Sequence, residues 1–236
     1  HVPTPDSYRP LGGQFGDPFT ATFIDELQQA IDALNDSKHG FSALIVCPYF
    51  ANEGFPDLPD GFMKQVANVV HNAGGVIIAD EVQPGFGRLG THMWGHERVG
   101  IVPDVVTLGK PMANGHPVGA VVTTSDIMKS FRSGYRYFNT FGGNPVSCAA
   151  AMAVLDVLEE DQLMDNAASV GMYAKTELTR LADRHDLIGD IRGQGLFFGA
   201  ELVTNRDAKT PAPQEANQLV NLLRQEGILT GTLGVH

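Results

Sequence analysis

The stretch GFMKQVANVVHNAGGVIIAD, residues 61–80, contains the patterns of a helix, a turn and a strand in succession. Apolar residues recur at helical spacing over 61–72, which is typical of a helix with one buried face. The run Ala73-Gly74-Gly75 is a turn signal, and the apolar run after it predicts a buried strand that ends at Asp80. This order predicts a helix-to-strand unit of an α/β sheet.

The same alternation extends to both sides of this unit. Upstream, apolar spacing predicts a helix over 22–34, and the apolar run 43–47 predicts a strand buried on both faces. Downstream, apolar runs at 104–108 and 118–123 predict further strands, too closely spaced for a crossover helix at every step. We therefore expect an α/β fold whose sheet is mostly parallel, with some antiparallel strands.

The pattern changes after Pro145. A helical pattern over 147–158 continues past Asp161 to about residue 181, and 188–203 is strand-like and interrupted by glycine. A helix near 213–226 and a last strand over 228–233 follow, whereas 1–20 predicts an irregular arm. We expect residues 1–160 to form part of a large domain and residues 161–236 part of a smaller α+β C-terminal domain.

Composition limits the classes of function. The chain has 236 residues, and 16 Lys and Arg against 27 Asp and Glu give it a formal net charge of −11, which disfavours binding to nucleic acid or to an anionic membrane. No apolar run approaches the roughly 18 residues of a membrane span, and residues 1–10 lack the features of a signal peptide. We therefore expect a cytoplasmic protein.

The cysteines and the first residue support two further expectations. Cys47 and Cys148 lie in apolar runs without a CxxC pair, so we expect both to pack in a core. The chain begins with His1 and has no methionine before Met63. We expect it to be an internal segment of a longer protein, which would leave the segment alone incomplete and inactive.

Two residues at predicted strand ends could carry chemistry. Asp80 follows four apolar residues, where a carboxylate persists only if a cation or strong donor faces it. It is either a helix cap or structural ion pair, or the counter-charge of a protonated ring nitrogen. Lys110 follows a predicted strand after a single glycine, and is either a solvated charge or an amine nucleophile with its stem in apolar surroundings. Together they match pyridoxal phosphate (PLP), which needs a Schiff-base lysine and an acid at its ring nitrogen.

Three blocks of sequence carry a resemblance to a known family. They are IADEVQPGFGRLG at 78–90, PDVVTLGKPMANG at 103–115 and FNTFGGNP at 138–145, and their order and spacing are similar to those of the class III (omega) aminotransferases. The segment IRGQGL at 191–196 resembles the start of that family's small domain, so the resemblance covers the whole chain. It implies PLP fold type I, the aspartate-aminotransferase-like α/β fold. It also implies PLP-dependent transfer of an amino group between an amine or amino acid and a keto acid.

The resemblance further implies roles for single residues. Lys110 would be the lysine that binds PLP and moves the proton, and Asp80 the partner of the pyridinium nitrogen. Val82 would pack on one face of the ring and Gln83 would reach the ring hydroxyl, although the residues alone also allow ordinary core packing and a loop donor. Thr140 would donate to the PLP phosphate of a neighbouring subunit, which implies a homodimer with shared sites. Thr140 is otherwise a turn residue before a pair of glycines.

The chain departs from the family's pattern at three places. The phosphate-cradling helix start and the aromatic residue that stacks on the ring would precede residue 1, and the arginine for a substrate carboxylate would follow residue 236. Cys47-Pro48 stands where many members have an acid before proline. If the segment lacks these groups, it is a catalytically silent structural fragment.

A second alternative is an enzyme with the same cofactor and another reaction. The runs 109–118 and 137–148 are similar to the branch of the family that contains phospho-lyases acting on phosphorylated amino alcohols. The sequence therefore leaves amino transfer and phosphate elimination both open.

No metal site is assigned from the sequence. His92 and His96 share an i, i+4 spacing, but no acidic third ligand follows at zinc-site spacing. The glycines of 193–199 precede an apolar strand instead of opening a helix after one, which argues against dinucleotide binding. His116, near Lys110, is either a capped loop histidine or a substrate contact.

Overall fold

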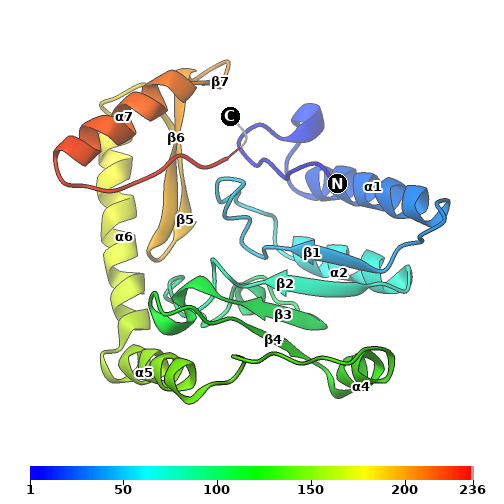
Figure 1. The fold of residues 1–236 in the computed structure, drawn as a ribbon. Coiled ribbons are helices and arrows are strands. Elements are labelled where there is room, and N and C mark those ends of the chain that lie inside the picture. The colour runs from blue at the N-terminus through cyan, green and yellow to red at the C-terminus, as the bar shows by residue number, and fades with distance from the viewer. Residues whose placement is uncertain (235–236) are drawn as a thin grey trace.

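The structure is a computed structural model that describes residues 1–234, and its strands form two separate sheets (Figure 1). The first sheet has the order β1-β2-β3-β4, with bounds β1 (Ala43–Val46), β2 (Val76–Asp80), β3 (Val105–Leu108) and β4 (Ala120–Thr123). The second has the order β5-β6-β7, with bounds β5 (Ile188–Gln194), β6 (Phe197–Asn205) and β7 (Thr210–Pro211). The predicted α/β character is confirmed.

The helices lie beside and between the sheets. The α-helices are α1 (Asp17–Asn35), α2 (Phe62–Asn72), α3 (Gly95–Arg98), α4 (Ser125–Gly134), α5 (Pro145–Glu160), α6 (Leu163–Ala182) and α7 (Pro213–Gln225). Two short 3-10 helices are η1 (Leu11–Gly13) and η2 (Lys110–Ala113). Within residues 1–234, no helix combines the length and apolar character that crossing a membrane requires.

The first sheet is mostly parallel, as predicted. β1 pairs with β2 and β2 with β3 in parallel, whereas β4 pairs with β3 in antiparallel register. The chain between β1 and β2 contains α2, because a parallel connection must return across the sheet. The short connection from β3 to β4 holds only η2, which is why β4 runs the other way.

The core of this part lies on one face of the sheet. The helices α1 and α2 pack there against Ile77 and the neighbouring strands, and the buried cluster comprises Phe19, Leu27, Ile31, Phe50, Phe62, Met63, Val66, Val70, Ile77 and Ile101. On β1, however, Ile45 is 63% exposed, so the expectation of a strand buried on both faces is wrong. The α1–α2 layer shields only one face of the sheet, and Ile45 belongs to the other.

Local residues explain where two helices begin and why one pattern is split. Pro18 and Asp17 occupy the first turn of α1, so this helix starts earlier than its apolar spacing predicts. Asn144 caps α5, with its side chain accepting a hydrogen bond from the Ser147 N–H at 3.0 Å. The helical pattern that continues past 160 is two helices, because Gln162 adopts a left-handed conformation with φ 51°.

The second sheet is an antiparallel hairpin with a short third strand. β5 and β6 pair over most of their length, and α6 packs against them where Gly171 meets Gly195. A Cβ atom on Gly171 would lie 2.0 Å from the Gly195 carbonyl oxygen, so this approach requires glycine. Figure 1 shows α6 running from the first sheet to the hairpin.

Two expectations about the chain are wrong. Residues 228–233 form no strand and pair with neither sheet, and Ile228 and Leu229 are 53% and 88% exposed. Cys148 is exposed, since among the described residues of α5 only Ser147 is buried. Cys47 is partly buried at the end of β1.

Candidate active site

Three strand ends meet at one edge of the first sheet. Cys47 follows β1, Asp80 ends β2, and Lys110 follows β3 after Gly109. Because β1, β2 and β3 are parallel, their carboxyl ends share one edge, which is where ligands bind in α/β sheets. The register pairs Asp80 with Thr107, so the predicted acid and lysine leave neighbouring strands at the same edge.

Asp80 is half-buried and turns the chain as it leaves the strand. Its Oδ1 accepts a hydrogen bond from the Val82 N–H at 3.0 Å, two residues ahead. This is the local bond by which an aspartate closes a turn. It uses one carboxylate oxygen, and a carboxylate can accept at both.

Lys110 stands at a strained position. Its φ is +25°, in a region that L side chains rarely adopt, and it opens η2 directly after the end of the strand. Such conformations cost roughly 1–3 kcal/mol and cluster at active sites, where the surrounding structure holds them. The side chain is exposed, so the expected apolar surroundings are not found within residues 1–234.

Val82 and Gln83 flank the same edge. The methyl carbons of Val82 would lie 3.6 and 3.7 Å from a Cβ atom on Gly109, so Val82 packs against the residue before Lys110. Gln83 donates from Nε2 to Asn52 Oδ1 at 2.8 Å. The structure thus brings the loop after β1, the turn after β2 and the turn after β3 together, and Asn52 is a residue that sequence reasoning missed.

The thiol of Cys47 reports on the same neighbourhood. Burial raises the pKa of Cys47, the backbone N–H groups of Ala51 and Tyr49 lower it, and the charges of Glu53 and Asp80 raise it, with a net rise. The thiol is therefore kept protonated at neutral pH. Cys47 is a neutral group beside Asp80, at the position where many family members carry an acid.

Glu81 is the second residue that sequence reasoning missed. It is fully buried, and its carboxylate accepts from the Gly95 N–H at 2.8 Å and the His96 N–H at 2.7 Å, with His96 Nδ1 2.8 Å away. These bonds hold the start of α3 (Gly95–Arg98) against the residue that follows β2. An acid directly after Asp80 was the available signal, because successive residues of an extended chain face opposite sides.

Thr140 and His116 lie in other surroundings. Thr140 is exposed in a turn between α4 and α5, and none of the side-chain hydrogen bonds among residues 1–234 links it to Asp80, Gln83 or Lys110. His116 Nε2 lies 2.8 Å from Ser147 Oγ, which ties the turn after Lys110 to the first turn of α5. This contact supports the capped-loop interpretation of His116.

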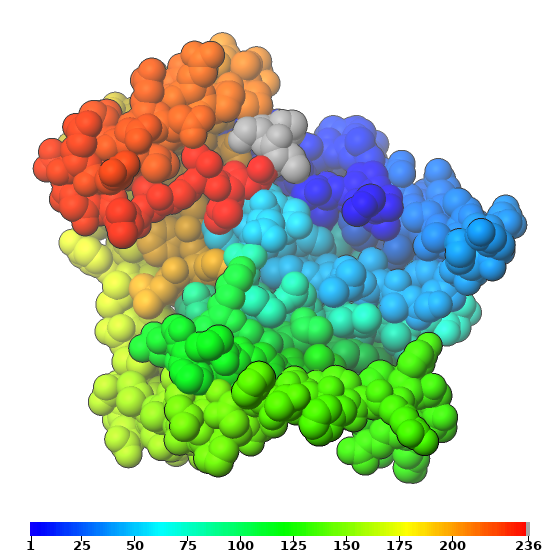
Figure 2. Space-filling model, in the orientation of Figure 1, coloured from blue at the N-terminus to red at the C-terminus, as the bar shows by residue number. Residues whose placement is uncertain are grey.

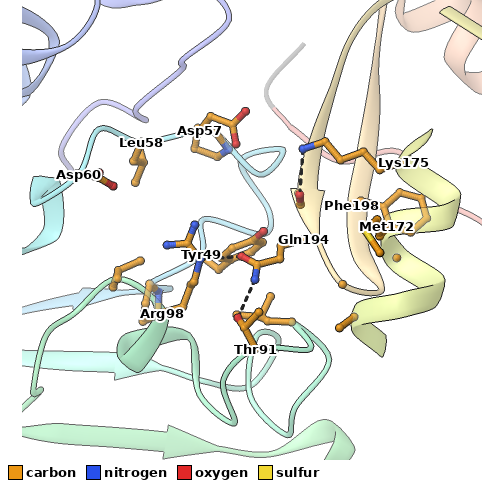
Figure 3. Close-up of a pocket in the computed structure, with 18 of the residues that line it drawn as sticks. Tyr49, Asp57, Leu58, Asp60, Thr91, Arg98, Met172, Lys175, Gln194 and Phe198 are labelled. Atoms are coloured by element: carbon orange, nitrogen blue, oxygen red, sulfur yellow. Dashed lines mark hydrogen bonds between the residues drawn. The ribbon is translucent and has the colours of Figure 1, made fainter. Parts of the chain in front are cut away.

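A cleft of about 770 Å³ lies between α6 and the segment 48–63 (Figure 3). Gln194 crosses one end, where its Oε1 accepts from Arg98 Nε at 2.6 Å and its Nε2 donates to Thr91 Oγ1 at 2.7 Å. None of the five predicted site residues lines this cleft. It lies at the junction of the two sheets, and the predicted residues belong to the strand-end edge instead.

Comparison with known proteins identifies the family. The family model described as aminotransferase class-III matches residues 11–236. The chain is 42% identical to alanine–glyoxylate aminotransferase 2 homolog 2 of Arabidopsis thaliana over 99% of this chain and 47% of that protein. It is 40% identical to human alanine–glyoxylate aminotransferase 2 over 86% of this chain and 41% of that protein.

Solved structures share the fold. A phospholyase from Arthrobacter in complex with phosphoethanolamine is similar with a TM-score of 0.88 and 40% identity, covering 92% of this chain and 51% of that chain. A Bacillus anthracis aminotransferase has a TM-score of 0.88 and 30% identity, covering 98% of this chain and 52% of that chain. The fold is therefore PLP fold type I, as the resemblance implied.

These comparisons correct the expected location. The Arabidopsis and human relatives are both named as mitochondrial proteins, so the expectation of a cytoplasmic protein is wrong. That expectation rested on the lack of a membrane-span run and of signal-peptide features in residues 1–10, whereas import into an organelle depends on a targeting segment of another kind.

The chain spans about half the length of the curated relatives it matches. Its family is nevertheless clear, since the family model matches residues 11–236. The sequence blocks 78–90 and 103–115 also include the ends of β2 and β3, and the block 138–145 leads into α5. The chain belongs to the class III aminotransferases, a PLP-dependent family.

Proposed function

We propose that the protein transfers an amino group between an amine or amino acid and a keto acid with PLP, and that Lys110 and Asp80 are its catalytic residues. The observation that carries the proposal is their placement at the carboxyl ends of two hydrogen-bonded parallel strands. Membership of a PLP-dependent family supports the choice of cofactor.

The residues present fit this cofactor. Asp80 offers a carboxylate to a ring nitrogen, Lys110 offers an amine to an aldehyde, and Gln83 offers an amide to a ring hydroxyl. Val82 supplies an apolar surface beside Gly109, where a Cβ atom would already be in contact. We propose that Asp80, Val82, Gln83 and Lys110 hold the ring.

When bound, PLP supplies a protonated ring that withdraws electrons from the substrate Cα–H bond. The Asp80 carboxylate would hold a bound ring nitrogen in its protonated form, since a fixed opposite charge favours that form. The Lys110 amine takes the proton from Cα and returns it as a general base and acid. Cys47, held neutral by its raised pKa, adds no competing charge beside Asp80.

We also propose that residues 1–160 are part of the PLP-binding large domain and residues 161–236 part of the small domain. The two separate sheets support this division, with α6 leading from one to the other. The N-terminal arm crosses it, because Arg9 donates to Glu201 of β6 at 2.8 Å.

A homodimer with shared sites completes the proposal. Figure 2 shows the segment after β4, in green to yellow-green, at the surface along one edge of the molecule. Aromatic side chains exposed in this segment are Phe131, Tyr135, Tyr137, Phe138 and Phe141, between 42% and 86%. Exposed apolar patches of this kind mark interaction surfaces. We propose that a second copy covers it and that Thr140 donates there to the partner's PLP phosphate.

Trapping the cofactor tests the assignment of Lys110. The protein at its full natural length is loaded with PLP, reduced with borohydride and digested, and we expect the pyridoxyl group on the peptide that contains Lys110. Lys64, Lys129 and Lys175 are internal controls, and finding the group on one of them would overturn the assignment. The catalytically silent alternative concerns the segment 1–236 alone, and it is supported if that segment takes up no cofactor under the same conditions.

The phospho-lyase alternative has one observation in its favour. The similar Arthrobacter structure is a phospholyase with phosphoethanolamine, at 40% identity. Release of inorganic phosphate from phosphoethanolamine, compared with transfer of an amino group from alanine to glyoxylate, separates the two reactions. We expect amino transfer, and phosphate release without transfer would favour the lyase.

A further inference from the structure

We propose that Arg192 is a positioning residue, which acts through the loop 50–55 to orient Gln83 toward the cofactor. The inference rests on the proposed function, because it concerns the residue assigned to the ring hydroxyl. Arg192 lies on β5, in the second sheet, and does not touch Gln83 itself. Three links connect them, and each is a contact in the structure.

The loop 50–55 is strained at both ends. Phe50 and Phe55 have φ values of 48° and 57°, which side chains other than glycine rarely adopt. The loop closes on itself through the Phe55 N–H, which donates to the Phe50 carbonyl at 3.2 Å. A strained conformation persists only where its surroundings hold it in place. The N–H groups of Glu53 and Gly54 also donate within the loop, to the carbonyls of Phe50 and Ala51. Contacts from outside the loop add to these bonds in holding its strained ends.

One contact leads from this loop to the site. Asn52 Oδ1 accepts the hydrogen bond from Gln83 Nε2 at 2.8 Å, and Asn52 is itself exposed. A glutamine amide has two N–H donors and one carbonyl oxygen. The bond to Asn52 uses one of the two donors and restrains the rotation of the Gln83 amide, which leaves the second N–H and the carbonyl oxygen for other partners.

The contact on the other side comes from Arg192. Its Nε donates to the carbonyl oxygen of Gly54 at 3.0 Å, and the residue is only 6% exposed. Nη2 donates to Glu201 Oε2 at 2.6 Å, and Nη1 lies 3.5 Å from Asp190 Oδ2. Glu201 accepts in turn from Arg9 at 2.8 Å. The rigid guanidinium thus has every edge occupied and holds Gly54 at a set distance.

Aromatic packing also holds the loop 50–55 against the second sheet. Phe55 packs edge-on against Phe197 of β6 with ring centroids 4.7 Å apart, and Tyr49 stacks on Phe197 at 5.8 Å. The β5–β6 hairpin is therefore the platform on which the loop rests. Arg192 supplies the polar contact between this hairpin and the loop. A guanidinium has several N–H donors, so it can donate to the Gly54 carbonyl and to the Glu201 carboxylate at the same time.

The test uses the absorption of the bound cofactor. In the full-length protein loaded with PLP, the visible band is titrated with pH, because Gln83 at the ring hydroxyl stabilises the ionised form. We expect Gln83→Ala to move the midpoint upward by about 0.5 to 1 pH unit, the scale of one hydrogen bond. Arg192→Lys should move it in the same direction. Arg192→Lys combined with Gln83→Ala should add less than the sum, since both act on one contact.

Arg206 provides a matched control. It lies in the connection after β6 and donates to the carbonyl oxygens of His185 and Ile188 at 3.0 and 2.7 Å, away from the loop 50–55. We expect Arg206→Lys to lower thermal stability as Arg192→Lys does, without moving the midpoint. A general loss of stability would move both variants alike and would overturn the proposal.

A second variant covers the case in which Arg192→Lys does not fold. Asn52→Ala changes an exposed side chain and breaks only the link to Gln83, so it should reproduce the shift of the midpoint. An unchanged midpoint in Asn52→Ala, or full additivity of Arg192→Lys and Gln83→Ala, would overturn the positioning role. If the unchanged protein forms no visible band with PLP, the proposed function fails instead, and this is recognised because no variant forms a band.

Discussion

Adjacent residues after β2 have opposite surroundings. Asp80 is half-buried at the open edge of the sheet, whereas Glu81 is fully buried and bonded to two backbone N–H groups and to His96. One carboxylate is thus available to a ligand and the other is committed to the fold. We therefore expect substitution of Asp80 to affect catalysis and substitution of Glu81 to affect stability.

At Asp80 we expect Asp80→Asn to lower amino transfer by at least about 100-fold, the scale of a lost fixed charge at a reacting centre. The asparagine oxygen can still accept from the Val82 N–H, so the fold and the reducible bond to Lys110 should persist. Turnover by the full-length protein is compared with that of Asp60→Asn, an exposed acid on the cleft away from the strand ends. Near-normal turnover would mean that Asp80 only closes its turn.

At Glu81 we expect Glu81→Gln to lower the free energy of unfolding by about 1–3 kcal/mol. The glutamine amide keeps one acceptor oxygen, but its NH2 group would face a backbone N–H donor of Gly95 or His96. Two buried donors would then lack an acceptor. Glu97→Gln is the matched control, because Glu97 is exposed and accepts one bond, from Trp94 at 3.2 Å. Urea unfolding of both variants gives the comparison, and equal small losses would contradict the buried network.

At the scale of elements, Asp104 joins a helix to two strands. Its Oδ2 accepts from the Ile77 N–H of β2 at 2.8 Å and lies 2.9 Å from Nε2 of His71 on α2. Burial raises the pKa of Asp104, but the hydrogen bonds from His71 and the Ile77 N–H outweigh it and hold the pKa below its usual value. The carboxylate at the start of β3 therefore stabilises the register from which Lys110 extends.

Because the pKa of Asp104 is lower in the folded protein than in the unfolded chain, its ionised form stabilises the fold. This stabilisation is fully present above the unfolded pKa, which is about 3.9, and is lost as pH falls through the pKa of the folded protein. We expect Asp104→Asn to be less stable than the unchanged protein at pH 6, and the difference to shrink as pH falls from 4 toward 3. Asp126→Asn, at an exposed pair with Lys129, should show no such trend. The measurement is the denaturant midpoint of each variant over this pH range. A stability difference that does not change with pH would mean that the ionised Asp104 carboxylate does not stabilise the fold.

At the scale of the whole molecule, the strand-end edge is one side of the proposed site. Ile45 and Lys110 are exposed at the sheet, and Thr140 is exposed in the segment between α4 and α5. The exposed aromatic segment between α4 and α5 is the surface that we propose a second copy covers. In the proposed homodimer, the residues that each subunit supplies to a site can be tested by mixing variants.

Mixing subunits tests whether sites are shared. Full-length Lys110→Ala and Thr140→Ala proteins should each be nearly inactive, whereas their heterodimer has both lesions in one site and leaves the other intact. We expect mixed dimers to recover up to about half of the activity per dimer, as one of two sites is whole. Sedimentation confirms the dimer, and an active monomer or the absence of recovery would refute the sharing of sites.

The sequence by itself determined the features that depend on neighbours along the chain. The helix-turn-strand order of 61–80, the strand that ends at Asp80 and the strand that ends shortly before Lys110 follow from apolar period and glycine turns. The structure has them where predicted. The parallel sheet with one antiparallel strand followed from the lengths of the connections. These features were readable because they arise from local backbone preference and from the period of burial.

Only the tertiary structure decided what each segment faces. Ile45 is exposed although its run is apolar, 228–233 is not a strand although its pattern is strand-like, and Cys148 lies on an uncovered part of α5. The bond of Gln83 to Asn52 joins residues 31 positions apart, and the hold of Arg192 on Gly54 spans 138. Burial and hydrogen-bond partners depend on segments distant in sequence, and the composition of a segment does not specify which of them will pack against it.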